Sequence, residues 1–238
     1  MELKGKVAII TGASGGIGEA VVRDLDKAGV KMVLTARSQE KLDKLAASLT
    51  NAVAVAGEVT DAQLPEKLLK TALEEYDRLD IVFNNAGVMN VGSIDEVDIE
   101  KICEMVRVNV ESVFRLGYVA LRHFKQQGSG FLLNTSSISA LKTAPNLGAY
   151  CGTKAAVEMF TDALRLELAG TNIGVGVIEP GTVATGLFDH WTDEQKQFIE
   201  SGGALKPKDI ARCVRFMLEQ PPHVLVPRLL VVPAAQPI

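Results

Sequence analysis

Tyr150 and Lys154 are the first residues of the sequence whose types and spacing could do chemistry. If a helix begins near Ala149, the two side chains are four residues apart and lie on the same helical face. A phenol with a pKa of ~10 exchanges protons poorly at neutral pH, but a nearby ammonium group favours its phenolate. The pattern therefore predicts that Tyr150 acts as a general acid or base and that Lys154 lowers its pKa.

Two further polar residues could serve the same reaction. Ser137 follows a predicted strand, where its hydroxyl could donate a hydrogen bond to an oxygen that gains negative charge. Asn109 stands among apolar residues of a predicted helix, and asparagine is a mediocre helix former, so its presence there needs a reason. The structural alternatives are a loop hydroxyl for Ser137, a buried amide satisfied by backbone for Asn109, and a core aromatic for Tyr150.

A glycine-rich turn, residues 11–18, follows the first predicted strand and opens a helix. Free N–H groups and the helix dipole attract a pyrophosphate at such a turn, and glycine lets the backbone approach it closely. The alternative is a plain tight turn. The predicted binding residues of the turn are Gly12, Ser14, Gly16, Ile17 and Gly18.

Arg37 stands at the end of the second predicted strand, where folds that prefer NAD place an acid on the ribose 2′-hydroxyl. No carboxylate is present there to repel a 2′-phosphate, and a guanidinium is well shaped to hold one. The sequence therefore favours NADP over NAD. The alternative is that Arg37 is a solvated surface charge.

The elements that must position these residues alternate between short apolar, β-branched runs and longer stretches of helical period. This alternation predicts an α/β fold: one doubly wound (Rossmann) domain over residues 1–238, with a seven-stranded parallel sheet and helices on both faces. The strands of residues 7–11 and 173–178 are nearly all small or apolar, so both should be central. The strands are predicted at residues 7–11, 31–36, 52–56, 79–84, 131–135, 173–178 and 224–232.

The two longest helices are predicted at residues 96–126 and 149–169. Their apolar stripes are wide, so part of each could face another subunit, or both could simply be well buried. The only long irregular stretch runs from residue 180 to residue 206. Irregular stretches of that length in a compact domain are usually lids or binding loops, so a substrate lid is predicted at about 182–206.

Composition excludes several classes of function. The 25 basic and 29 acidic residues give a net charge of −4, and no basic stripe is present to bind nucleic acid. No apolar run approaches the ~18 residues of a membrane span. The three cysteines and three histidines lack metal-ligand spacing, so no metal is expected. The first residues lead into a strand rather than a signal peptide, so a cytoplasmic protein is expected.

Three motifs in order resemble those of the short-chain dehydrogenase/reductases, namely TGxxxGxG at residues 11–18, NNAG at 84–87 and YxxxK at 150–154. Ser137 lies thirteen residues before Tyr150, as the family pattern requires. The resemblance implies an oxidoreductase that moves a hydride between NADP and a carbonyl or secondary alcohol. It also implies a homotetramer assembled through the two long helices.

The same resemblance assigns further roles. Asn109 would order a proton-relay water, and Lys154 would hold the nicotinamide ribose hydroxyls. The sequence departs from the family at Glu58, where aspartate is usual, and at Gly15, where many NADP-dependent members carry a basic residue. The additional cofactor-binding residues implied are Glu58, Val59, Asn85, Ala86, Gly87, Pro180, Gly181, Val183 and Thr185, together with Tyr150 and Lys154.

The residues expected to border the substrate are Leu141, Leu147, Leu187, Phe188 and Trp191, which indicate a mostly apolar pocket for a small or medium substrate. Residues 178–181, 205–210 and 226–233 look similar to the subgroup that contains clavulanate dehydrogenase and the 3-hydroxy acid (serine) dehydrogenases. Two other interpretations stay open: a non-catalytic NADP-binding redox sensor, and an enzyme that epimerises its substrate by oxidation and reduction in one pocket.

Overall fold

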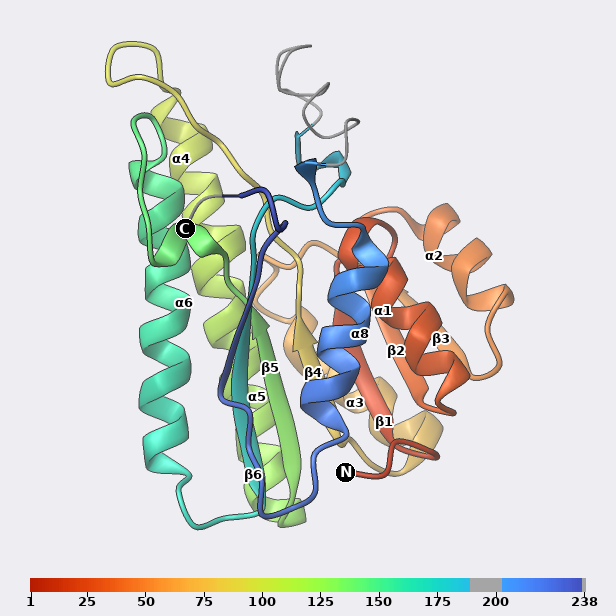
Figure 1. Cartoon of the computed structure of the whole chain (residues 1–238). Helices are drawn as coiled ribbons and strands as arrows, with labels where there is room; N and C mark the ends of the chain where they lie inside the picture. The colour runs from red at the N-terminus through yellow and green to blue at the C-terminus, as the bar shows by residue number, and fades with distance from the viewer. Residues whose placement is uncertain (189–202, 237–238) are drawn as a thin grey trace.

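Seven parallel strands form one sheet in the order β3-β2-β1-β4-β5-β6-β7 in the computed structural model, which describes residues 1–188 and 203–236 (Figure 1). The predicted seven-stranded α/β fold is confirmed, and the strands predicted to be central, β1 and β6, each have a neighbour on both sides. The strands are β1 (Val7–Thr11), β2 (Lys31–Ala36), β3 (Ala52–Ala56), β4 (Ile81–Asn84), β5 (Gly130–Thr135), β6 (Ile173–Pro180) and β7 (Arg228–Val231).

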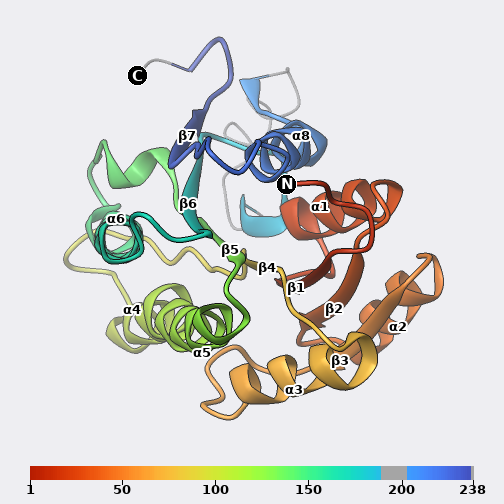
Figure 2. The ribbon, with the colours of Figure 1, turned by 90° about the horizontal axis from the view of Figure 1, so that it is seen from below.

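Helices cover both faces of the sheet (Figure 2). Buried side chains of α1, α2 and α8 pack on one face, and those of α3, α5 and α6 pack on the other. Because both faces are covered, the inner strands need no polar side, and all five residues of β1 are buried. The helices are α1 (Gly16–Lys27), α2 (Gln39–Ala47), α3 (Leu64–Tyr76), α4 (Ile99–Val106), α5 (Ser112–Gln127), α6 (Gly148–Glu167) and α8 (Pro207–Leu218).

The prediction of one uninterrupted helix over residues 96–126 is wrong in two respects. The helix begins at Ile99, because the Asp98 side chain caps it by accepting a hydrogen bond from the Lys101 N–H. A π-helical turn, Arg107–Glu111, then separates α4 from α5. Such turns insert one extra residue and are frequent at functional sites. This turn contains Asn109, so the helix departs from regular geometry at a predicted site residue.

Two predicted strands are shorter in the structure. The last strand was expected over residues 224–232 but pairs only from Arg228 to Val231, and Pro227 before it has no N–H to donate. The strand expected from residue 79 begins at Ile81. The backbone groups of Leu79 bind the side chain of Gln127 instead, which accepts from its N–H at 3.4 Å and donates to its carbonyl at 2.7 Å.

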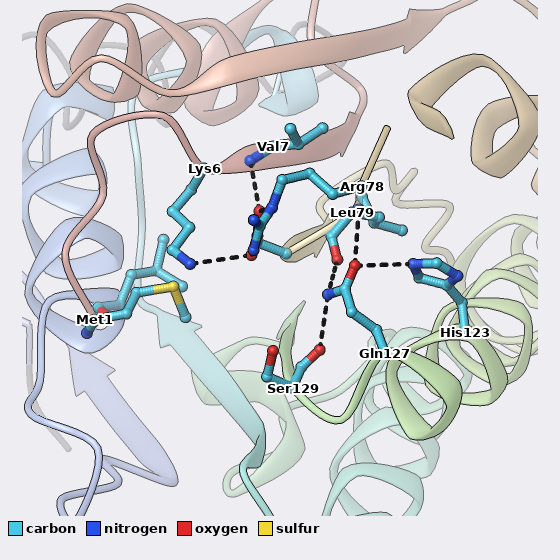
Figure 3. Close-up of polar contacts among 10 residues, drawn as sticks. Met1, Lys6, Val7, Arg78, Leu79, His123, Gln127 and Ser129 are labelled. Carbon is cyan, nitrogen blue, oxygen red and sulfur yellow. Dashed lines mark hydrogen bonds and ion pairs between the residues drawn. The ribbon is translucent and has the colours of Figure 1, made fainter. Parts of the chain in front are cut away.

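A buried carboxylate, that of Asp80, ties β1 to β4 at the amino ends of the strands. Figure 3 labels the residues that bind it, namely Lys6, Val7 and Arg78. Asp80 accepts hydrogen bonds from Arg78 at 2.6 and 2.7 Å, from the Val7 N–H at 3.0 Å and from Lys6 at 3.2 Å. This cluster lies at the end of the sheet opposite to the glycine-rich turn. Its contacts are all internal, which indicates a role in stability.

The strand order reverses between β1 and β4, from which the chain winds outward in both directions. In doubly wound sheets the crevice at such a switch point, outside the carboxyl ends of the strands, binds the ligand. The glycine-rich turn follows β1 and the Asn84–Gly87 motif follows β4, so the fold brings both to this crevice. Among the described helices, none is long and apolar enough to cross a membrane.

Candidate active site

The glycine-rich turn adopts a backbone that side chains would obstruct. Gly12 and Gly16 have φ angles of 64° and 54°, in the left-handed region that favours glycine. A Cβ atom at Gly18 would collide with the carbonyl oxygen of Gly12, so only glycine permits α1 to pack this closely on the turn. The first N–H groups of any helix lack an intrahelical partner, and Gly15 at the start of α1 provides no side-chain cap to occupy them.

Asn85 and Thr11 lock this turn to the end of β4. The Thr11 hydroxyl accepts hydrogen bonds from the N–H groups of Asn85 and Ala86, both at 3.0 Å. The Asn85 side chain in turn donates to the carbonyl of Thr11 at 3.1 Å and to that of Gly12 at 3.4 Å. Asn85 therefore supports the backbone of the phosphate turn, a contact that its predicted role in cofactor binding did not include.

The four predicted catalytic residues come from three segments and meet at the carboxyl end of the sheet. Ser137 follows β5, Tyr150 and Lys154 lie in the first two turns of α6, and Asn109 lies in the π turn. All four are buried, with side chains less than a tenth exposed. The Ser137 hydroxyl accepts a hydrogen bond from the Ser139 N–H at 3.1 Å, so its own proton is free to be donated elsewhere.

Asn109 is held by three hydrogen bonds. Its side-chain oxygen accepts from the Val88 N–H at 2.9 Å, and its amide donates to the Val88 carbonyl at 2.8 Å. The amide also donates to the Thr153 hydroxyl at 3.2 Å, which links the π turn to α6 between Tyr150 and Lys154. A Cβ atom at Gly87 would lie 3.3 Å from the Asn109 oxygen and 3.7 Å from Lys154 Nζ, so the end of the Asn84–Gly87 motif adjoins both.

Burial dominates the electrostatics of Tyr150 and Lys154. It raises the pKa of Tyr150 to about 12, and the neighbouring Ser137 hydroxyl opposes this rise. It lowers the pKa of Lys154 to about 8, which the Glu158 carboxylate opposes. Lys154 Nζ lies 5.8 Å from the centre of the Tyr150 ring and donates to the Thr135 carbonyl at 3.0 Å. Burial is therefore the largest influence on the pKa of Tyr150 in this structure. The lowering of that pKa by Lys154 stays a prediction.

The loop after β6 returns to the glycine-rich turn. A Cβ atom at Gly16 would lie 3.2 Å from the methyl group of Thr185, so this loop and the turn are in contact. Val183 is buried and pairs with Leu205, and the Thr182 N–H donates to the side chain of Gln236 at 3.0 Å. Of the predicted cofactor residues in this loop, Thr185 thus adjoins the glycine-rich turn, and Pro180, Gly181 and Val183 precede it along the chain.

The remaining predicted cofactor residues follow β2 and β3. Arg37 is exposed directly after β2, and no described residue accepts a hydrogen bond from its guanidinium. Glu58 is exposed and Val59 is half-buried after β3. Ser14 and Ile17, in the glycine-rich turn, are half-buried. The structure brings these residues to the same edge of the sheet as the turn, because all of them follow the carboxyl ends of parallel strands.

The predicted substrate residues are only partly described. Leu141 is exposed and Leu147 is half-buried in the segment before α6. Leu187 is half-buried in the short 3₁₀ turn Gly186–Phe188, which Phe188 ends. Trp191 and most of the predicted lid lie outside the described residues. The two ends of the lid segment pair with each other, because the Ala184 N–H donates to the Leu205 carbonyl at 2.8 Å.

Sequence reasoning did not single out several residues that build this site. Thr11 and Thr153 serve as hydrogen-bond acceptors for Asn85 and Asn109. Glu158 lies one helical turn after Lys154 and is buried. A buried acid on the same face as a predicted catalytic pair is a signal that helical spacing could have provided.

The crevice fits a dinucleotide. The glycine backbone with positive φ, the missing cap of α1 and the absence of space for a Cβ at Gly18 together form a cradle for phosphate oxygens. Residues 85–87 connect this cradle with the buried polar groups, because Asn85 binds the turn and Gly87 adjoins Asn109 and Lys154. Within the described residues, no group of three or more histidine, cysteine or acidic side chains is arranged to hold a metal ion.

Comparisons with known proteins agree with this geometry. The family model described as short chain dehydrogenase matches residues 6–196. An uncharacterised oxidoreductase of Staphylococcus saprophyticus is 35% identical, with 98% of each chain covered. A serine dehydrogenase complexed with NADP⁺ has a TM-score of 0.91 at 26% identity, with 98% of this chain and 96% of that one covered. An alcohol dehydrogenase of the archaeon Thermococcus sibiricus, complexed with 5-hydroxy-NADP, has a TM-score of 0.88 at 32% identity, with 98% of both covered.

Proposed function

Because the chain belongs to the short-chain dehydrogenase family, and is thus an oxidoreductase, we propose that it is an NADP-dependent alcohol dehydrogenase or carbonyl reductase. The observation that carries this proposal is the convergence of Asn109, Ser137, Tyr150 and Lys154 beside the phosphate cradle. A bound NADPH would supply the hydride for reduction of a carbonyl.

Tyr150 is the proposed proton donor for reduction. Burial keeps the phenol protonated over the whole neutral range, which suits a general acid that must hold its proton until charge develops on the substrate oxygen. The Ser137 hydroxyl retains a free proton and would donate a hydrogen bond to the same oxygen. In the oxidation direction Tyr150 would accept the proton, which requires a bound positive charge to offset its raised pKa.

Lys154 and Asn109 would position groups around this tyrosine. Lys154 donates one of its three protons to the Thr135 carbonyl, so two remain to hold ribose hydroxyls. Asn109 is fixed by Val88 and Thr153, and its place beside Lys154 suits the ordering of a proton-relay water.

The cofactor would lie along the cradle, held by the N–H groups of residues 12–18, by the loop from Pro180 to Thr185 and by residues 85–87. Arg37 is the proposed ligand of a 2′-phosphate, since it is an exposed cation directly after β2. Structural relatives of this chain bind NADP⁺ and 5-hydroxy-NADP, which supports the same preference.

The proposed substrate is a small or medium, mostly apolar carbonyl compound or secondary alcohol. Leu147, which precedes Tyr150 in the sequence, and Leu187, which follows it, are both half-buried and would contribute apolar surface. Phe188 and Trp191 would complete the pocket, with residues of about 182–206 acting as a lid over a single domain of residues 1–238.

We further propose a cytoplasmic homotetramer assembled through α5 and α6. Three large apolar side chains of these helices are substantially exposed, with Tyr118 at 49%, Met159 at 69% and Leu166 at 68%. Exposed apolar groups gathered on two helices favour burial against another subunit. Light scattering of the purified protein tests this assembly, and a monomer would refute it.

The test of the activity is the loss of NADPH absorbance when the protein is mixed with ketones, aldehydes, diketones and oxo acids in turn. The matched variant is Tyr150→Phe, which removes only the phenol oxygen. Turnover should fall by orders of magnitude in the variant while NADPH binding, followed by its fluorescence, is retained. A variant that turns over at the normal rate would refute the role of Tyr150.

A further inference from the structure

A cluster of charged side chains lies directly beyond Lys154 along α6. It consists of Glu158 and Asp162 from α6, Glu179 from β6 and Arg228 from β7, and is called here the Arg228 cluster. Nη1 of Arg228 lies 2.7 Å from Glu158 Oε2 and 3.0 Å from Glu179 Oε1. Nη2 of Arg228 lies 3.2 Å from Asp162. Glu158 is 5% exposed and Glu179 is fully buried.

The three carboxylates of the Arg228 cluster are not equally well stabilised. Asp162 is about a third exposed and also pairs with Arg165 at 3.4 Å, so water and a second cation stabilise it. Glu158 and Glu179 share a single nitrogen of Arg228. Lys154 also acts on Glu158 by charge, but its ammonium group donates to the Thr135 carbonyl. In a buried site, two carboxylates that share one guanidinium nitrogen repel each other, so ionisation of both costs free energy.

The buried carboxylates of the cluster also have too few hydrogen-bond donors. Arg228 pairs with Glu179 by charge at 3.0 Å, but its N–H groups make no hydrogen bond to that carboxylate, so neither oxygen of Glu179 has a hydrogen-bond partner among the described residues. The Ser136 hydroxyl lies 2.8 Å from Glu158 Oε1 and 3.2 Å from the Lys154 carbonyl, yet a hydroxyl has one proton for two acceptors. The buried part of the cluster therefore lacks a donor, and one additional proton would supply it.

We propose that Glu158 and Glu179 share one proton and that this carboxyl pair is a positioning unit for Lys154. The pair connects the two segments that carry the site. Glu158 lies one turn after Lys154 on α6, and Glu179 lies directly before the Pro180–Gly181 turn of the proposed cofactor loop. The protonated pair joins these segments without excess negative charge, and Glu158 acts through the lysine rather than on substrate.

The ionisation behaviour of the groups supports this proposal. Burial, and next the charge of Glu158, raise the pKa of Glu179 to about 7. Burial lowers the pKa of Lys154 to about 8, and the charge of Glu158 opposes that lowering. Glu179 therefore loses its proton around pH 7, just below the range in which Lys154 loses its own.

The first experiment detects the proton directly and needs no turnover. The infrared difference spectrum of the whole protein between about pH 6 and about pH 9 should contain the C=O band of one protonated buried carboxyl. Glu179→Gln should abolish the band, because Glu158 is then the only buried carboxylate paired with Arg228 and stays ionised. Asp162→Asn, the matched control on the same guanidinium, should retain it. A difference spectrum without the band, or a band that survives in Glu179→Gln, would overturn the proposal.

The second experiment measures the effect on Lys154, and its activity arm rests on the proposed reductase function. In Glu158→Gln the alkaline limb of reductase activity should move to lower pH by about one unit, because the charge that sustains the lysine is lost. The NMR titration of isotopically labelled Lys154, assigned with Lys154→Arg, should shift equally even if no substrate is found. Asp162→Asn should leave both unchanged. An unshifted lysine titration in Glu158→Gln contradicts the proposal, whereas absent turnover with a shifted titration contradicts only the proposed function.

Discussion

The side-chain amide of Asn109 donates a hydrogen bond to the hydroxyl of Thr153 at 3.2 Å and so joins the π turn to the catalytic helix α6. Thr153 also donates to the Tyr150 carbonyl at 2.7 Å, which places the contact between Tyr150 and Lys154. The π turn brings Asn109 to this position, and the hydroxyl of Thr153 keeps it there.

Thr153→Val should reduce activity more than stability. Valine has nearly the same shape, so the change removes the acceptor for Asn109, and the free energy of unfolding should fall by about 1 kcal/mol. The kcat for reduction should fall roughly tenfold, because Asn109 loses the bond that orients it.

The matched control for this change is Thr161→Val, two turns later on α6. The Thr161 hydroxyl accepts from the Asn134 amide at 2.9 Å and donates to the Val157 carbonyl at 2.7 Å, the same pattern away from the site. This variant should lose similar stability in a denaturant titration and keep its kcat. Equal kcat values for the two variants would argue against a role for the Asn109–Thr153 bond in the reaction.

Arg37→Asp should transfer cofactor preference from NADPH to NADH. The arginine is exposed after β2, and a carboxylate there would repel a 2′-phosphate and could accept a bond from a ribose hydroxyl. The ratio of kcat/KM values for the two cofactors should change by about a hundredfold or more. Lys70→Asp, which alters an exposed cation on α3, is the control. Unchanged selectivity in Arg37→Asp would show that another group binds the phosphate.

Reductase activity should decline as pH rises through about 8. The phenol of Tyr150 stays protonated until about pH 12, so it does not limit the reaction in this range. The pKa of Lys154 is lowered to about 8 by burial. Above that pH the residue loses the positive charge with which it would bind the ribose hydroxyls of the cofactor. Measurement of kcat against pH, with circular dichroism to verify folding, checks this expectation. A profile that stays level to about pH 10 would contradict it.

Asp80→Asn should destabilise the protein at neutral pH and not in acid. Burial would raise the pKa of Asp80, but the hydrogen bonds from Arg78, the Val7 N–H and Lys6 outweigh it and hold the pKa below its usual value of 3.8. The contribution to stability is therefore present above about pH 3.8 and is lost as the pH falls below it.

The expected loss in Asp80→Asn is about 1–2 kcal/mol, since Arg78 and Lys6 are partly exposed and water screens their charges. Urea titrations at several pH values measure it. Glu40→Gln, which removes an exposed ion pair with Lys44, should have little effect at any pH. A loss in Asp80→Asn that stays constant into acid would show that the carboxylate charge is not what stabilises the β1–β4 junction.

Short-range patterns in the sequence were sufficient to predict the sheet, the shared helical face of Tyr150 and Lys154, and the glycine-rich turn. The alternation of apolar runs and helical stretches predicted the seven-stranded α/β sheet, because buried parallel strands need continuous apolar sequence whatever their partners are. The spacing of Tyr150 and Lys154 placed both on one helical face, since a helix fixes neighbours four residues apart. The glycines of residues 11–18 indicated a phosphate turn, because few other reasons require so many residues without a side chain.

Only the tertiary structure decided the properties that depend on burial and on contacts between distant segments. The sequence placed Lys154 beside Tyr150, but the burial that raises the pKa of Tyr150 arises from the packing of α6 against neighbouring segments. The π turn at Asn109 interrupts a helix that periodicity draws as continuous. Glu158, Glu179 and Arg228 belong to three elements, and no spacing along the chain shows that they meet on one guanidinium nitrogen, because the order of strands in the sheet brings them together.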